Sequence, residues 1–130
     1  MTTAQSWDWT RAIFDHVHLR VADLKRSRTF YLATLEPLCI PLLLDTPQLV
    51  CFANLALSAD TPPSTGVHLA FTAGSRKQVD AFHAAAIVAG GSDNGAPGPR
   101  EYGPYAAYVL DPDGTNLEAA HRSFALAADS

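Results

Sequence analysis

A glutamate, Glu118, stands inside an apolar stretch near the end of the chain. The run Asp-Pro-Asp-Gly at residues 111–114 precedes it, and this proline and glycine favour a tight turn between two strands. Side chains alternate between the two faces of a strand, so Glu118 faces away from Leu117 and Ala119. A carboxylate among apolar side chains is costly to bury unless an Arg, a Lys or a metal ion pairs with it. The sequence therefore raises the question of which cation Glu118 meets.

Two histidines are candidates for the same chemistry as Glu118. His16 and His68 lie 52 positions apart, each at the start of an alternating apolar run that is typical of a strand. Two imidazoles and one carboxylate form a facial ligand set for Fe(II), Mn(II), Zn(II) or Ni(II), with positions left open for water or substrate. Two other interpretations stay open. Each histidine could bond a backbone carbonyl instead, and Glu118 could pair with Arg20.

The offset of 52 positions relates more than the two histidines. It also pairs residues of like type in both halves: Leu19 with Phe71, Lys25 with Lys77, Phe30 with Phe82, Ala33 with Ala85 and Leu35 with Ile87. An offset shared by a strand and a helix indicates an internal repeat. The sequence thus predicts an α+β fold of two βαβββ modules whose mixed sheets together form one concave surface. His16 and His68 would occupy the first strands of the two modules, and Glu118 the last strand of the second.

Helix caps and loop formers set the boundaries within each module. Asp23 is expected to cap a first helix, and Ser75 a second helix that ends at Gly90. Residues 92–104 are rich in Gly and Pro and are expected to form a surface loop. The predicted organisation is a leader at 1–11, a single domain at 12–123 with modules at 12–60 and 64–123, and a tail at 124–130.

The composition is typical of a globular domain. The chain has 130 residues, 48% of them hydrophobic, which is enough for a core of its own. Its net charge of −4 argues against a nucleic-acid partner. No apolar run approaches the roughly 20 residues that span a bilayer, and the first residues lack the features of a signal peptide. Its two cysteines are expected to be reduced thiols in a cytoplasmic protein.

Three motifs occur in order along the chain: Asp15-His-Val-His-Leu-Arg-Val-Ala-Asp-Leu24 with Ser27 and Phe30-Tyr31, then Gly66-Val-His-Leu-Ala-Phe71, then Asp111-Pro-Asp-Gly-Thr-Asn-Leu-Glu118. Together they cover about residues 12–121. They resemble the vicinal oxygen chelate superfamily, which holds glyoxalase I, extradiol dioxygenases, fosfomycin-resistance enzymes and bleomycin-resistance proteins. The resemblance implies that His16, His68 and Glu118 hold a divalent transition metal.

The chain departs from this family at one position. A further metal-ligand position of the family falls within residues 49–57, which contain no Glu or His. The resemblance thus implies a three-ligand site, as in the dioxygenase-like and fosfomycin-resistance-like members, rather than the four-ligand site of glyoxalase I.

The implied function is that of a small metal-dependent enzyme of the glyoxalase or dioxygenase type, a lyase or an oxidoreductase. It would chelate two neighbouring oxygens of a small substrate, with isomerase, lyase, transferase and dioxygenase chemistry all open. The alternative is a protein of the bleomycin-resistance type, which sequesters a ligand without metal. The joint presence of His16, His68 and Glu118 favours the enzyme, because a sequestering protein does not need them.

Side chains near the expected metal site are candidates for substrate contacts. His18 and Arg20 share the His16 face of their strand, and Arg20 would hold an anionic group or form a structural salt bridge. Tyr102, Tyr105 and Tyr108 surround the expected loop and the strand after it, and one of them would donate a proton or hydrogen bond to substrate, with Tyr105 as the candidate. No general base is assigned, although a tyrosine or a metal-bound water is a candidate. Members of the superfamily commonly dimerise, so a homodimer is expected. The metal ligands would meet either within one chain or across two.

Overall fold

The computed structural model describes residues 6–123, which form two successive βαβββ modules. The first contains β1 (Val17–Arg20), α1 (Leu24–Leu35), the short 3-10 helix η1 (Glu36–Leu38), β2 (Leu42–Asp45), β3 (Val50–Phe52) and β4 (Leu55–Ser58). The second contains β5 (His68–Thr72), α2 (Arg76–Val88), β6 (Ser92–Pro99), β7 (Tyr105–Leu110) and β8 (Asn116–His121). The second helix begins 52 positions after the first, as the internal repeat predicts. The expected tail at 124–130 lies outside the described residues.

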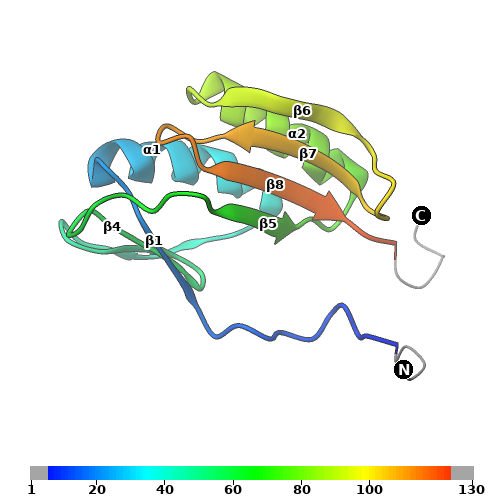
Figure 1. Ribbon diagram of the computed structural model, residues 1–130, viewed down its shortest axis with the longest axis horizontal. Coiled ribbons are helices and arrows are strands. Elements are labelled where there is room, and N and C mark those ends of the chain that lie inside the picture. Colours follow the sequence, from blue (N-terminus) through cyan, green and yellow to red (C-terminus); the bar gives the residue numbers. More distant parts are fainter. Residues whose placement is uncertain (1–5, 124–130) are drawn as a thin grey trace.

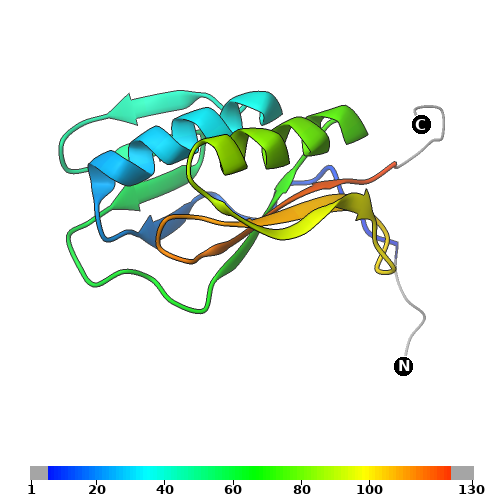
Figure 2. The same ribbon diagram turned by 90° about the horizontal axis from the view of Figure 1, so that it is seen from above.

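Each module contributes one four-stranded sheet (Figure 1). The strand order is β1-β4-β3-β2 in the first sheet and β5-β8-β7-β6 in the second. In each sheet the first strand of the module runs parallel to the last, and the remaining pairs are antiparallel. The two helices contact each other and lie along the same side of the molecule (Figure 2). The predicted α+β fold with two mixed sheets is confirmed.

Both helices begin at the capping residues that the sequence indicates. Asp23 accepts a hydrogen bond of 3.1 Å from the backbone N–H of Arg26. Ser75 accepts one of 3.1 Å from the backbone N–H of Gln78. The faces behind these caps are apolar and pack against the sheets, so the helices cover one side of each sheet and leave the other side open. Neither described helix is long and apolar enough to cross a membrane.

The prediction of a surface loop at 92–104 is wrong over most of its length, because Ser92–Pro99 form the strand β6. This strand lies at the edge of its sheet and pairs with β7 alone, with two register shifts. Prolines are tolerated there because a strand at an edge has N–H groups that no neighbour needs. Gly95 lies against the Tyr108 ring, where an added Cβ would stand 2.7 Å from a ring carbon. The glycine therefore permits a close approach of β6 to β7.

Candidate functional site

His68 and Glu118 form a pair on the open face of the second sheet. Phe71 and Leu117 pack into the core beneath α2, so strand alternation directs His68 and Glu118 to the other face. The His68 Nε2 and Glu118 Oε1 atoms are 2.9 Å apart. The Glu118 side chain is 4% exposed and that of His68 is 48% exposed. Within this chain, the buried carboxylate thus meets an imidazole.

Two tyrosine hydroxyls complete the surroundings of the Glu118 carboxylate. Tyr102 donates a hydrogen bond to Glu118 Oε2, and its hydroxyl oxygen lies 2.6 Å from that of Tyr108. Burial of the hydroxyl end of Tyr102, followed by its hydrogen bonds to Glu118 and Tyr108, raises the pKa of Tyr102 above its ordinary value. The Tyr102 hydroxyl therefore keeps its proton and acts as a hydrogen-bond donor at this site.

The sequence contains a signal that places Tyr108 beside Glu118. Tyr108 and Glu118 lie equally far from Asp113 on either side of the turn, and the structure pairs them across β7 and β8. A hairpin with its centre at Asp113 brings these two positions together. No comparable signal exists for Tyr102, which reaches Glu118 from the turn between β6 and β7.

His16 lies apart from this pair. It precedes β1, its side chain is 67% exposed, and its Nδ1 atom lies 2.8 Å from the carboxylate of Asp15. Among residues 6–123, no group of three or more His, Cys, Asp or Glu side chains is arranged to hold a metal ion. One chain thus brings together His68 and Glu118 but not His16.

Strand pairing identifies the position in the first module that corresponds to Glu118. Glu118 lies opposite Ala70 in the second sheet, and Ala56 lies opposite His18 in the first. His18 and Ala70 are related by the repeat offset of 52, so Ala56 is the counterpart of Glu118. An alanine offers no side-chain ligand. The predicted ligands therefore number three protein side chains rather than four.

The predicted substrate contacts His18 and Arg20 belong to a network on the first sheet. His18 Nε2 lies 2.7 Å from Ser58 Oγ, which donates a hydrogen bond of 2.6 Å to Asp60. Arg20 Nε lies 3.4 Å from the same Asp60 carboxylate. The ion pair of Arg20 is thus with Asp60 and not with Glu118, so that interpretation of Glu118 is wrong.

Tyr105, the third predicted substrate contact, faces away from Glu118. Its hydroxyl donates a 2.7 Å hydrogen bond to Asp80 of α2, and the guanidinium of Arg76 lies 4.9 Å from its ring centroid. Its side chain packs against the core on the helix-covered side of the sheet. The structure therefore brings Tyr102 and Tyr108, rather than Tyr105, to the carboxylate.

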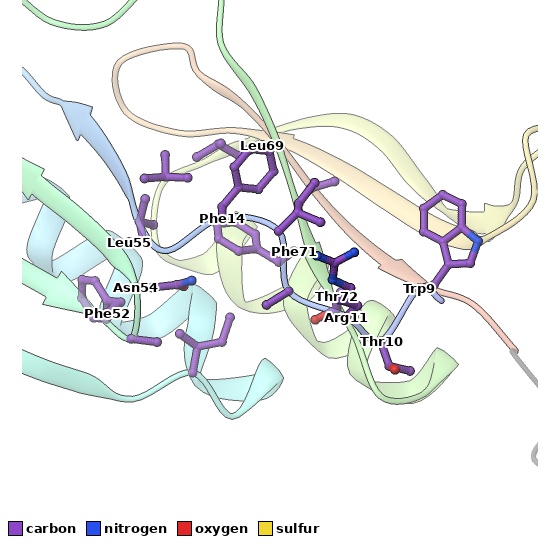
Figure 3. Close-up of a pocket in the computed structure, with 16 residues that line it drawn as sticks. Trp9, Thr10, Arg11, Phe14, Phe52, Asn54, Leu55, Leu69, Phe71 and Thr72 are labelled. Atoms are coloured by element: carbon purple, nitrogen blue, oxygen red, sulfur yellow. The ribbon is translucent and has the colours of Figure 1, made fainter. Parts of the chain in front are cut away.

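The stretch Trp9–Phe14, before β1, forms one wall of a large pocket (Figure 3). This pocket has a volume of about 470 Å³ and opens between that stretch, the β3–β4 hairpin and β5. Phe14, Phe71 and Leu69 line it, and it is predominantly apolar (Figure 3). A second pocket, of about 210 Å³, lies at Glu118 itself. The larger pocket suits an apolar ligand, and the smaller one is lined by Tyr102, Glu118 and Arg122 among others.

Solved structures resemble this chain, whereas no protein-family model and no curated protein sequence matches it significantly. A glyoxalase/bleomycin resistance protein from Albidiferax ferrireducens T118 is 34% identical, with a TM-score of 0.76, over 85% of this chain and 100% of that one. A glyoxalase-related enzyme from Fulvimarina pelagi is 21% identical, with a TM-score of 0.67, over 91% and 94%. A lactoylglutathione lyase from Agrobacterium tumefaciens is 21% identical, with a TM-score of 0.60, over 85% and 94%. The last two matches concern the fold alone.

Proposed function

Since the chain belongs to the glyoxalase/bleomycin resistance protein family of the vicinal oxygen chelate superfamily, we propose that it is a small enzyme dependent on a divalent transition metal. Its substrate would be a small molecule that binds through two neighbouring oxygens. The observation that carries the proposal is the pair formed by His68 Nε2 and the buried carboxylate of Glu118, 2.9 Å apart on the open face of the second sheet.

The donor atoms of this pair fit such a metal. Imidazole nitrogen and carboxylate oxygen together suit Fe(II), Mn(II), Zn(II) or Ni(II). His68 and Glu118 extend from neighbouring strands, β5 and β8, so the sheet fixes their relative positions. A cation would also neutralise the charge of a carboxylate that is only 4% exposed. His68 and Glu118 would supply two ligands, and His16 the third.

The third ligand is proposed to come from a second copy of the chain. His16 is 67% exposed, and its Nδ1 atom lies 2.8 Å from the carboxylate of the neighbouring Asp15. In a symmetric homodimer one His16 from each chain would meet the His68–Glu118 pair of the other, giving two equivalent sites. This arrangement would make the homodimer the functional unit of the enzyme.

The remaining side chains of the site would bind and orient the substrate. When bound, the metal would supply Lewis-acid stabilisation of an enolate or oxyanion, or with iron the activation of dioxygen. On metal binding at Glu118 the Tyr102 hydroxyl would turn from this carboxylate and donate its hydrogen bond to a substrate oxygen that gains negative charge. Tyr108, whose hydroxyl lies 2.6 Å from that of Tyr102, would orient this donor. Lyase and oxidoreductase chemistry are both compatible with these roles.

Metal content measured by mass spectrometry tests the proposal. The protein should be purified without a histidine tag, beside His68→Ala and Glu118→Ala. We expect about one transition metal per chain in the parent protein and loss of the metal in both variants, because each variant removes one of three ligands. Absence of metal from the parent protein after incubation with Fe(II), Mn(II), Ni(II) or Zn(II) would exclude the enzyme as proposed.

A second candidate function is the sequestration of an apolar ligand without metal. The pocket of about 470 Å³ favours it, because that pocket is mainly apolar and His16, His68 and Glu118 do not line it. The two functions differ in their response to a chelator. Ligand binding in the large pocket would survive removal of metal, whereas binding through vicinal oxygens at Glu118 would not.

A further inference from the structure

The smaller pocket, about 210 Å³ in volume, is lined by two residues of opposite charge. Glu118 and Arg122 are the charged residues that line it. The other residues that line it are small, apolar or aromatic: Ala70, Phe71, Thr72, Ala73, Ala120, Trp9 and Tyr102. A ligand held at Glu118 would therefore share its pocket with one cation of the protein, Arg122.

Strand geometry accounts for the placement of Arg122. Glu118 and Ala120 belong to β8, and Arg122 directly follows that strand. Side chains two and four positions apart share a face of a strand, so all three lie on the open face of the sheet. Ala120, the middle residue, is small and leaves space above the sheet between the carboxylate and the guanidinium.

Aromatic rings hold the guanidinium of Arg122 in place. Its central carbon lies 4.1 Å from the ring centroid of Trp9 and 6.0 Å from that of Tyr102. Tyr102 is the residue that donates its hydroxyl hydrogen bond to Glu118. The same side chain therefore contacts both charged residues of the pocket, and a planar guanidinium stacked in this way loses little freedom when it binds a ligand.

The guanidinium of Arg122 has no acidic partner within residues 6–123. Arg20, Arg26 and Arg28 are paired with the carboxylates of Asp60, Asp113 and Asp45, whereas Arg122 is the arginine that lines the pocket of Glu118. A stacked guanidinium still presents N–H donors along its edge, in the geometry that matches a carboxylate or a phosphonate in two parallel hydrogen bonds. Its ring contacts thus orient Arg122 and leave these donors available.

We infer that Arg122 determines specificity by binding an anionic group of the substrate. The substrate class is then a small organic anion that carries two neighbouring oxygens at one end and a carboxylate or phosphonate at the other. The assignment of the oxygen end rests on the proposed metal function at His68 and Glu118. The assignment of the anionic end rests on Arg122 and its aromatic contacts alone.

Matched probe compounds test the oxygen end and the anionic end of the substrate separately. The compounds 3,4-dihydroxybenzoate and 3,4-dihydroxybenzamide share the vicinal hydroxyls and differ in charge at the far end. Benzoate and benzamide lack the hydroxyls but differ in charge in the same way. Dissociation constants would be measured by calorimetry for the full chain, with and without Mn(II), for the parent protein, Arg122→Gln, Arg122→Lys and Arg76→Gln. Arg76 is the matched control, because its guanidinium also stacks on a tyrosine, Tyr105, but outside this pocket.

The parent protein should bind each carboxylate about tenfold or more tightly than its amide, the value of a charge-assisted hydrogen-bonded pair. Arg122→Gln should reduce this ratio to near one, Arg122→Lys should retain part of it, and Arg76→Gln should leave it unchanged. The inference would be overturned if Arg122→Gln preferred the carboxylate over the amide as strongly as the parent protein does. It would also be overturned if the parent protein showed no such preference. Failure of the proposed function looks different: Mn(II) would not tighten either dihydroxy compound, while the ratio of benzoate to benzamide would still depend on Arg122.

Discussion

Tyr31 of α1 donates a hydrogen bond of 2.5 Å to Asp111, the first residue of the turn that leads from β7 into β8. Both residues are buried, although the helix belongs to the first module and the turn to the second. The other oxygen of the Asp111 carboxylate accepts the backbone N–H groups of Asp113 and Thr115. A helix of one module therefore fixes the start of the strand that carries Glu118.

Replacing Tyr31 by Phe should lower the free energy of unfolding by about 1–3 kcal/mol at neutral pH, because Asp111 loses a buried donor. Burial, and then the neighbouring charge of Asp111, raises the pKa of Tyr31 above its ordinary value. The stability due to this tyrosine is thus present below about pH 10, the value in the unfolded chain, and is lost as the pH rises further.

The difference in free energy of unfolding between the parent protein and Tyr31→Phe should therefore become smaller above about pH 10. Urea unfolding followed by circular dichroism at neutral and alkaline pH measures this difference. Other tyrosines and lysines titrate in both proteins and cancel in the comparison. A deficit that is the same at both pH values would contradict the role assigned to the Tyr31 proton.

Replacing Gly95 by Ala should destabilise the protein by about 1–3 kcal/mol, as overpacking does elsewhere. The added methyl group would stand 2.7 Å from the Tyr108 ring, and Gly95 has a φ of +153°, which favours glycine. Gly98 of the same strand is the matched control, because a Cβ added there meets nothing within 4 Å. Thermal unfolding should show a lower midpoint for Gly95→Ala than for Gly98→Ala, and equal midpoints would argue against the close approach of β6 to β7.

Mixing two defective variants tests whether a metal site is shared between chains. His16→Ala and His68→Ala should each bind no metal. After they are unfolded together and refolded, random pairing makes about half of the dimers mixed, each with one intact site, so about a quarter of all sites should recover. Metal content and activity would both report this recovery. If the three ligands instead come from one chain, the mixture should bind no more metal than either variant alone.

Replacing Ala56 by Glu should add a fourth protein ligand. Ala56 is the counterpart of Glu118 in the repeat and lies opposite His18. A further carboxylate should tighten metal binding, which competition with a chelator would measure as a higher affinity. Ala56→Gln is the control of similar size with a weaker ligand. An affinity unchanged by Ala56→Glu would place Ala56 away from the metal.

Local signals predicted much of the fold. The caps Asp23 and Ser75 start the two helices, and the turn at 111–114 joins the last two strands. These features depend on hydrogen bonds between residues close in sequence, which is why a single sequence contains them. The strand β6 was missed because an edge strand with one partner can carry the Gly and Pro that elsewhere indicate a loop.

The sequence likewise predicts one part of the candidate site, and the tertiary structure decides the other. His16, His68 and Glu118 followed from residue types, from strand alternation and from the repeat, all of which are properties of the sequence. The structure decided that Glu118 lies beside His68, and that Tyr102 covers its second oxygen. Such contacts depend on which strands become neighbours and on where a turn folds back.

The sequence by itself determined two repeated modules and the residue types able to bind a metal, because periodicity and capping act over a few positions. Only the tertiary structure decided that Arg122 stacks on Trp9, more than a hundred positions earlier, and that Ala56 occupies the place of a ligand. It also separated His16 from His68 and Glu118 within one chain. Long-range pairing of strands and packing of the segment before β1 set these relationships, and no local pattern encodes them.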